Sequence, residues 1–417
     1  MTIRLVSAEK LQLTPRIGVA KLAKLAFDGE DLSGIWAELV TRLKSNPEDI
    51  EAAMDLSLVA QLTGQQQLGL EIQSEALSAR RLFRSPCNCD APRLRVLAFA
   101  AATDIGGNTP LEFLLENSDI ELYTLYVVPG LDLPDALPDH DIAFVAIPDS
   151  DDTRQTLDEV TRLTHNWPRP VANTPRKVSE LERDRLHKLL TDAPGIDIPA
   201  TARVDRDDLA DVVAGEAPLT ELLPDAKFPL IVRPVGSQAG RGLEKLEHTD
   251  DIEPYLAAWP DEDLFISRFV DYSGTDGLFR KYRIVFVDGR PYAGHMAIAD
   301  QWKLWYLNAD MNLNANKRTE EARFMSSFES EFAARHAQAL SEIVRRVGLE
   351  YFAIDCAESK SGELLIFEAD IAMIVHNMDP AEIYPYKEPQ MKKIFAAFAA
   401  MLKSKSKSGK QDQAKAA

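Results

Sequence analysis

The sequence has few cysteines and no long apolar run, and both absences narrow the class of protein. Three cysteines among 417 residues cannot form the disulfide framework of a small secreted domain. Cys87 and Cys89 have no second Cys or His pair at zinc spacing nearby, so we interpret them as ordinary thiols. No stretch approaches the roughly 20 apolar residues of a membrane span, and the N-terminus lacks the apolar segment of a signal peptide. We therefore expect a cytoplasmic protein with no membrane partner.

Positive charge is also scarce. The chain has 47 Lys and Arg against 66 Asp and Glu, for a formal net charge of −19. Nucleic-acid affinity depends on clustered basic residues that neutralise phosphates, so nucleic acid is not expected as a partner. The hydrophobic content of 45% is typical of a globular chain, and the length allows two to four domains of roughly 100–200 residues.

Several catalytic motifs are missing. There is no G-x-G-x-x-G dinucleotide fingerprint, which disfavours a nicotinamide dehydrogenase, and no G-x-x-x-x-G-K-[ST] P-loop. Neither a Ser/His/Asp nor a Cys/His constellation is recognisable. We therefore expect chemistry that requires no side-chain nucleophile.

Residues 1–90 are predicted to form a helical module. Apolar residues recur at three- and four-residue intervals over residues 31–44, 47–64 and 66–83, with short turns between them. The pattern is similar to one or two tetratricopeptide units, and fewer than three such repeats rarely stand alone. Two interpretations remain open: the module docks a peptide or protein partner, or it is a surface for packing or homodimerisation.

Residues 91–195 alternate between strand and helix patterns, which indicates a doubly wound parallel sheet in an α/β fold. The loop 103–110 follows the first strand, a position where such sheets bind ligands. Two interpretations of this loop remain open: it contacts the acceptor substrate, or it serves only as a turn of the chain.

The most informative stretch is 351–370, YFAIDCAESKSGELLIFEAD. Period-two alternation predicts two antiparallel strands joined by a turn at 359–362. Asp355 then lies on the first strand, and Glu368 and Asp370 share one face of the second. Such carboxylates would repel one another unless a hard cation lay between them, which favours Mg²⁺ or Mn²⁺ holding nucleotide phosphates.

A buried strand, FPLIVRP, ends at Arg233 and Pro234 and is followed by a glycine-rich loop at 236–242. Backbone N–H groups of such a loop can approach phosphate oxygens, and a simple hairpin turn is the alternative. The loop residues expected to contact phosphate are Gly236, Ser237, Gly240, Arg241 and Gly242.

The order of these parts over residues 93–402 resembles the ATP-grasp superfamily, including D-alanine ligases and RimK-type glutamate ligases. The resemblance implies a pre-ATP-grasp domain at 91–195 and a two-part ATP-grasp domain at 196–402. It places Arg233 where the family has a phosphate-binding Lys, residues 236–242 at the phosphate lid, and Asp355, Glu368 and Asp370 at the metal site. Asp370 replaces the usual Asn of that site.

The resemblance also concerns the nucleotide hinge and one cationic strand. Arg268 occupies the place of an acidic hinge residue, and backbone groups of Phe269 and Val270 are expected to bind adenine. On the strand 279–287, period two puts Lys281 and Arg283 on one face, and Arg283 matches the Arg of the family's D-x-R strand. Either cation would offset charge on a transferred phosphoryl group, with a surface salt bridge as the alternative.

Two histidines are candidates for substrate binding. His295 faces the substrate or is hydrogen-bonded in the core, and His376 lines the acceptor pocket or caps a loop. Residues 403–417 alternate Lys and Ser at first and are expected to be a disordered basic tail.

Together these features predict an ATP-dependent carboxylate–amine ligase that forms an amide through an acylphosphate and releases ADP and phosphate. Its substrates would be a small carboxylate and an amine, such as an amino acid or a peptide. A nucleotide-binding scaffold with a degenerate site, or a small-molecule phosphotransferase, are the alternatives.

Overall fold

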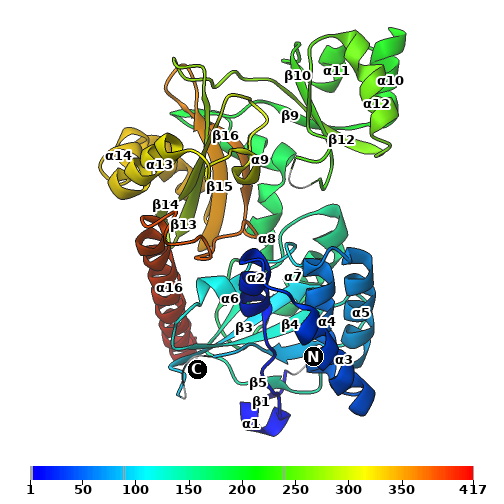
Figure 1. Cartoon of the computed structure of the whole chain (residues 1–417), viewed down its shortest axis with the longest axis vertical. Helices are drawn as coiled ribbons and strands as arrows, with labels where there is room; N and C mark the ends of the chain where they lie inside the picture. The colour runs from blue at the N-terminus through cyan, green and yellow to red at the C-terminus, as the bar shows by residue number, and fades with distance from the viewer. Residues whose placement is uncertain (1–2, 88, 90, 238–239, 417) are drawn as a thin grey trace. The chain divides into compact units, whose positions relative to one another are not determined.

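The computed structural model describes residues 3–87, 89, 91–237 and 240–416, with side chains described as far as residue 407. The chain divides into two compact units. The first comprises residues 1–179, 349–352 and 371–417, and the second comprises residues 180–348 and 353–370. The predicted α/β class is confirmed, since each unit combines β-sheets with helices (Figure 1).

The first unit begins with the predicted helical module. Its helices are α1 (Ala8–Leu11), α2 (Val19–Phe27), α3 (Ser33–Ser45), α4 (Ile50–Leu62) and α5 (Gln66–Ala79). The apolar faces of α2, α3 and α4 share a core that includes Leu22, Leu39 and Val59, and Ile72 of α5 packs against it. The periodicity thus predicted the helices correctly, whereas the tetratricopeptide likeness stays a prediction.

A five-stranded sheet follows in the same unit, with the order β2-β4-β3-β6-β7. The strands are β2 (Leu82–Arg84), β3 (Leu94–Ala101), β4 (Ile120–Val127), β6 (Ile142–Val145) and β7 (Val171–Ala172). β3 pairs in parallel with β4 and β6, and β6 pairs in parallel with β7, so the predicted parallel sheet is present. The two-residue strands β1 (Leu5–Val6) and β5 (Leu137–Pro138) pair separately. The remaining early helices are α6 (Leu111–Leu114), α7 (Asp151–Thr164) and α8 (Pro175–Val178).

The loop after β3 is held by the helical module. The Gln61 side chain accepts a hydrogen bond from the Ile105 N–H at 2.8 Å, and the buried Gln73 donates to the Thr103 carbonyl oxygen at 3.0 Å. Helices α4 and α5 therefore pack into the same unit as the sheet and fix this loop.

The C-terminal residues correct one expectation. Helix α16 runs from Lys387 to Ala416, so residues 403–416 are helical where a disordered tail was expected. Leu402 and Ser406 are buried, and Lys403 pairs with Asp119 at 2.6 Å. The Lys and Ser residues continue a helix whose preceding turns, around Phe398 and Met401, are anchored in the core. Composition alone did not reveal that anchoring.

The second unit has two sheets. One has the order β11-β10-β12-β9, and its strands are β9 (Thr201–Asp205), β10 (Leu230–Pro234), β11 (Glu244–Leu246) and β12 (Asp263–Arg268). The other has the order β14-β13-β15-β16-β8, and its strands are β8 (Ile196–Asp197), β13 (Phe279–Val287), β14 (Arg290–Ala299), β15 (Tyr351–Glu358) and β16 (Leu364–Asp370). β15 and β16 are antiparallel, as the hairpin pattern predicted.

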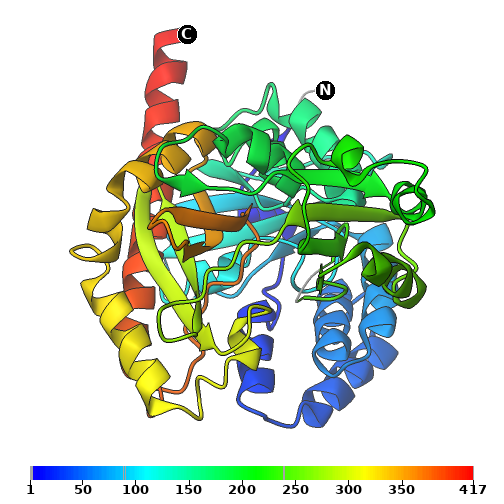
Figure 2. The same cartoon turned by 90° about the horizontal axis from the view of Figure 1, so that it is seen from above.

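Helices cover both sheets of this unit. Those with the first sheet are α10 (Arg206–Ala214), α11 (Leu219–Leu222) and α12 (Ile252–Ala258), and those with the second are α9 (Arg183–Leu190), α13 (Ala315–Ser327), α14 (Phe332–Arg335) and α15 (Ala337–Val347). Figure 2 shows α13 to α15 in yellow beside β13 and β14. Because α9 packs against β9 and β16, the unit begins near residue 180, earlier than the boundary expected at 196. Within the described ranges, no helix combines the length and apolar character of a membrane span.

Candidate nucleotide-binding cleft

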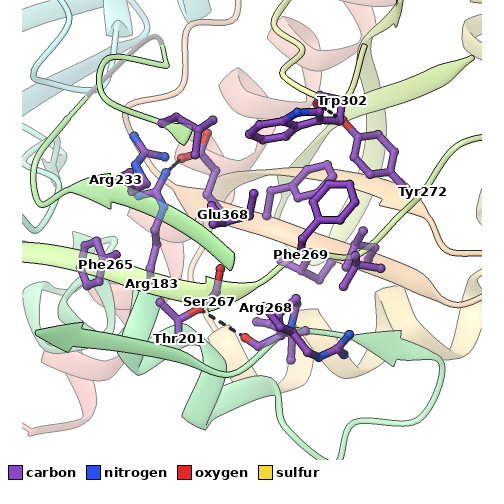
Figure 3. Close-up of a pocket in the computed structure, with 18 of the residues that line it drawn as sticks. Arg183, Thr201, Arg233, Phe265, Ser267, Arg268, Phe269, Tyr272, Trp302 and Glu368 are labelled. Carbon is purple, nitrogen blue, oxygen red and sulfur yellow. Dashed lines mark hydrogen bonds and ion pairs between the residues drawn. The ribbon is translucent and has the colours of Figure 1, made fainter. Parts of the chain in front are cut away.

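A cleft in the second unit is lined by strands of both sheets, including β10, β12, β13 and β16. The cleft has about 1010 Å³ of space when the part open to solvent is included. Figure 3 shows Arg183, Arg233 and Glu368 close together, with Phe265 on their side, and Phe269, Tyr272 and Trp302 grouped apart from them, with Arg268 on their side.

The charged end brings together Arg183, Arg233, Lys281 and Glu368. Arg183, at the start of α9, forms an ion pair with Glu368 on β16 (Figure 3). Arg233, at the end of β10, donates to the Ser237 hydroxyl at 3.0 Å and to the Ser237 carbonyl oxygen. Burial and the charge of Arg183 lower the pKa of Arg233 to about 9, which leaves the guanidinium charged at neutral pH. Burial alone would raise the pKa of Glu368, but Arg183, Lys281 and Arg233 together outweigh it and hold that pKa below its ordinary value.

Asp355 lies on β15 beside these groups, and its side chain is only 1% exposed. Arg283 binds both carboxylate oxygens, at 2.8 Å through Nε and at 3.0 Å through Nη2. Lys281 Nζ lies 2.7 Å from Oδ2. Burial disfavours the charge of Asp355, yet Arg283 and Lys281 outweigh it and hold the pKa of this carboxyl well below its usual range. Asp355 is therefore ionised at neutral pH.

The structure places Asp355 and Glu368 of the predicted metal site opposite each other, and Asp370 at the end of the same hairpin. Asp355 pairs with Glu368 across the hairpin, and Asp370 pairs with Ala353 at its end. A β-bulge directly after Asp355 shifts the register there. In the described part of the chain, however, no three His, Cys, Asp or Glu residues are arranged to hold a metal. Asp355 and Glu368 are instead neutralised by arginine and lysine, so metal binding stays a prediction.

The other end of the cleft is aromatic. Phe269 and Trp302 meet edge to face with ring centroids 5.7 Å apart, and the Tyr272 hydroxyl donates to the Trp302 carbonyl oxygen at 2.6 Å. Val270 also lines this end. The Phe269 N–H donates to the Pro229 carbonyl oxygen at 2.9 Å, so this N–H is already used. Adenine recognition through Phe269 would therefore rely on its ring and carbonyl group.

Arg268 lies at the aromatic end, where the resemblance implies an acid. It donates to Asp197 at 3.0 Å and lies 3.4 Å from Asp225. Arg268 is thus paired with two carboxylates, Asp197 and Asp225.

The glycine-rich loop is only partly described, because Gln238 and Ala239 lie outside the described residues. Gly236, Gly240 and Gly242 all have positive φ, and a Cβ on Gly242 would lie 2.5 Å from Cδ of Pro234. Gly242 is therefore needed for close packing of the turn. Arg241 forms a two-pronged ion pair with Asp261, at 2.9 and 3.0 Å, and is half exposed. It is not among the residues that line the cleft.

The two histidines differ in their surroundings. His295 lies on β14 opposite Arg283, with its ring 4.8 Å from that of Tyr306. His376 belongs to the first unit, where its ring packs near Phe27 and Phe113 and its Nδ1 accepts the Met378 N–H at 3.1 Å. Neither lines the cleft of the second unit. Their roles in substrate binding stay predictions.

Sequence reasoning missed Arg183 as a member of the site. The residue was noted only as part of a connecting helix, and its partner Glu368 lies 185 positions away. The ion pair between Lys281 and Asp355 was also missed, as was the contribution of Tyr272 and Trp302 to a binding surface. The one local signal was a cation at the first turn of a helix, which is too common to single out a site.

Comparisons with known proteins gave matches only among solved structures. Neither the protein-family models nor the curated protein sequences match the chain. The chain is similar to a RimK-domain ATP-grasp protein of Sphaerobacter thermophilus, with 15% identity, a TM-score of 0.43, and coverage of 74% of this chain and 99% of that one. It is similar to a D-alanine–D-alanine ligase of Bacillus anthracis solved with ATP, with 12% identity, a TM-score of 0.45, and coverage of 76% and 99%. It is also similar to the VanG D-Ala:D-Ser ligase of Enterococcus faecalis, with 15% identity, a TM-score of 0.46, and coverage of 76% and 99%.

Proposed function

We propose that this protein is an ATP-dependent carboxylate–amine ligase whose nucleotide binds in the cleft of the second unit. The observation that carries the proposal is the division of one cleft into a cationic end and an aromatic end. A nucleotide has the same division, since its base is flat and weakly polar and its phosphates are strongly anionic. Arg183, Arg233 and Lys281 match the phosphates, whereas Phe269 and Trp302 match the base.

The proposed reaction has two displacements. A substrate carboxylate oxygen attacks the γ-phosphorus of ATP, and ADP leaves. The amine nitrogen then attacks the acyl carbon of the acylphosphate and loses a proton, and phosphate leaves as the amide forms. Both steps need neutralisation of phosphate charge and correct orientation, which fixed cations supply without a side-chain nucleophile.

Lys281 and Arg283 have different roles in the proposed reaction. Both project from β13 onto Asp355, and Lys281 also lines the cleft. Phosphate oxygens would compete with Asp355 for Lys281, while the two hydrogen bonds to Arg283 keep Asp355 in place.

A divalent cation fits the donor chemistry of the same region. Asp355, Glu368 and Asp370 would hold Mg²⁺ or Mn²⁺, since carboxylate oxygens are the ligands these ions prefer. When bound, the ion supplies charge neutralisation at the phosphates. Asp355 and Glu368 are already ionised, so no proton has to leave them first.

The test is release of ADP and phosphate from Mg-ATP by the full chain, with amino acids and short peptides screened as acid and amine. We expect one acid–amine pair to stimulate release by about tenfold or more, and mass spectrometry to find the joined product. A phosphorylated small molecule would indicate a phosphotransferase instead. Nucleotide binding without turnover under any pair would contradict the ligase proposal.

One observation favours a second candidate, a nucleotide-binding scaffold with a degenerate site. Asp355 is fully engaged by two cations, and Glu368 is engaged by a third. If these pairs persisted with nucleotide bound, no carboxylate would be available for a metal. ATP binding that is independent of Mg²⁺, together with no release of ADP, would support this candidate.

A further inference from the structure

Two cysteines that the proposed function does not use lie close together in the first unit. Cys87 and Cys89 belong to the segment that joins β2 to β3, and their Sγ atoms are 2.8 Å apart. A disulfide bond is about 2.05 Å long, so the sulfur atoms need to approach by less than about 1 Å to bond. We propose that Cys87 and Cys89 form a reversible dithiol–disulfide site. This proposal is independent of the proposed function.

Both sulfur atoms are accessible to a small oxidant. Each cysteine is partly exposed, and Cys87 also lines a cavity of the first unit together with Lys21 and Glu112. The third cysteine differs, because Cys356 lies on β15 with 0% exposure. Burial also raises the pKa of the Cys356 thiol well above its ordinary value, which makes it unreactive.

The contacts of the two thiols differ in part. Either sulfur can donate the hydrogen bond that joins Cys87 and Cys89, so either thiol can lose its proton first. Cys87 also lines the cavity of the first unit. Its sulfur also lies 3.7 Å from the Ile120 carbonyl oxygen, which holds it beside β4.

The oxidation balances with a low-molecular-weight disulfide as the oxidant. With Cys87 as the first to react, its thiolate attacks one sulfur of that disulfide, forms a mixed disulfide and releases one small thiol. The Cys89 thiol then attacks Cys87 Sγ, loses its proton and releases the second small thiol. In total, two protein thiols are oxidised and one small disulfide is reduced to two thiols.

The short spacing of Cys87 and Cys89 indicates a reversible disulfide and not a structural one. A bond between Cys87 and Cys89 closes a loop of only three residues, which removes little chain entropy from the unfolded state. Such a short ring is also strained, and strained, exposed disulfides are the ones that are readily reduced. We therefore expect the bond to form and break within the range of glutathione buffers.

The test equilibrates the full chain with glutathione buffers from reduced to oxidised, then blocks free thiols with a maleimide and measures the intact mass and the peptide map. We expect Cys87 and Cys89 to lose maleimide labelling together, with a mass lower by two hydrogen atoms before labelling, and a reductant to restore both thiols. Cys356 should be labelled only after denaturation.

Three variants sharpen this result. Cys87→Ser and Cys89→Ser should each leave one thiol that carries a glutathione adduct and forms no internal bond, whereas Cys356→Ala should behave as the wild type does. Separate glutathione adducts on both wild-type cysteines, a disulfide-linked dimer, or full labelling of both thiols in every buffer would overturn the proposal.

Discussion

Each compact unit contains buried carboxylates paired with arginine, but the two sets of groups make different hydrogen bonds. In the first unit, Asp55 accepts backbone hydrogen bonds from Ile17 at 2.6 Å and from Gly18 at 3.3 Å. Glu112 accepts the Ala20 N–H at 3.0 Å and the Ser85 hydroxyl at 2.9 Å. These carboxylates fix the start of helix α2, a structural task that a ligand cannot take over.

In the second unit, the carboxylates bond to cationic side chains. Asp355 is bound by Lys281 and Arg283, and Glu368 by Arg183. Side-chain ion pairs can exchange partners when phosphates or a metal arrive, because the backbone does not have to move. Buried charge alone therefore does not identify a site. What distinguishes the second cluster is that its carboxylates are held by cationic side chains, which can exchange partners.

The largest effect should come from removing the more deeply buried carboxylate of the second cluster. Asp355→Asn leaves Lys281 and Arg283 without a counter-ion, and breaking such a buried pair costs about 3 kcal/mol or more. Asp55→Asn keeps an acceptor for one of the two backbone N–H groups and leaves no buried cation without its only partner, so we expect a smaller loss of about 1–2 kcal/mol. Urea unfolding followed by circular dichroism measures both. Equal losses would contradict the distinction between the clusters.

Glu368→Gln should act on function and not on stability. The Glu368 side chain is 27% exposed and that of Arg183 is 21% exposed, so the loss of stability should stay within about 1 kcal/mol. Phosphate release should fall by about 100-fold, because the cleft loses a charge that would hold the metal. Glu363→Gln, on the exposed turn of the same hairpin, is the matched control and should keep its activity. Retained activity in Glu368→Gln would contradict a role for Glu368 in the proposed site.

Two arginines near the glycine-rich loop differ in whether they line the cleft. Arg233 lines the cleft, whereas Arg241 is paired with Asp261 outside it. Arg233→Met should weaken ATP binding by about tenfold or more, the effect of losing one charge-assisted contact, and Arg241→Met should change it by less than about twofold. Titration calorimetry with Mg-ATP gives both constants. Similar losses of ATP affinity in the two variants would indicate that Arg241 also contacts the phosphates.

The smallest effect is a difference in how stability depends on pH. The pKa of Asp55 lies above its ordinary value because burial outweighs Arg16, whereas that of Asp355 lies below. The contribution of Asp355 is thus fully present above the unfolded pKa of about 3.9 and is lost as the pH falls toward its lower folded pKa. The contribution of Asp55 is present below about pH 3.9 and is lost as the pH rises through its higher folded pKa.

The stability difference between the wild type and Asp355→Asn should therefore grow as the pH rises from about 3 toward 5. The difference between the wild type and Asp55→Asn should shrink over the same range. Urea midpoints at several pH values measure both differences, with slopes of at most about 1.4 kcal/mol per pH unit for each group. Slopes of the same sign would show that the two carboxyls have similar environments.

The sequence predicted local features of this site more reliably than long-range ones. The hairpin at 351–370 and the pairing of Asp355 with Glu368 follow from strand alternation and a short turn, which are local properties. Arg233 at the end of a buried strand was found for the same reason.

The partners of these residues could not be predicted in this way. Arg183 reaches Glu368 across 185 positions, and Lys281 meets Asp355 only because β13 and β15 are neighbours in the sheet. The sequence therefore did not reveal that two cations meet on the Asp355 carboxylate. The helical end of the chain was missed because its preceding turns are anchored by tertiary packing.

The most direct test of the central claim, that the cleft binds a nucleotide, is thermal unfolding of the wild type and Arg233→Met with Mg-ATP, and with ATP in the presence of a chelator. Binding at about 100 times the dissociation constant adds about 2.7 kcal/mol of stability, which raises the midpoint by about 3 °C in a chain of this size. We predict that increase for the wild type with Mg-ATP, a smaller increase with chelator, and little change for Arg233→Met. No increase for the wild type at millimolar Mg-ATP, or an equal increase in Arg233→Met, would contradict nucleotide binding at this cleft.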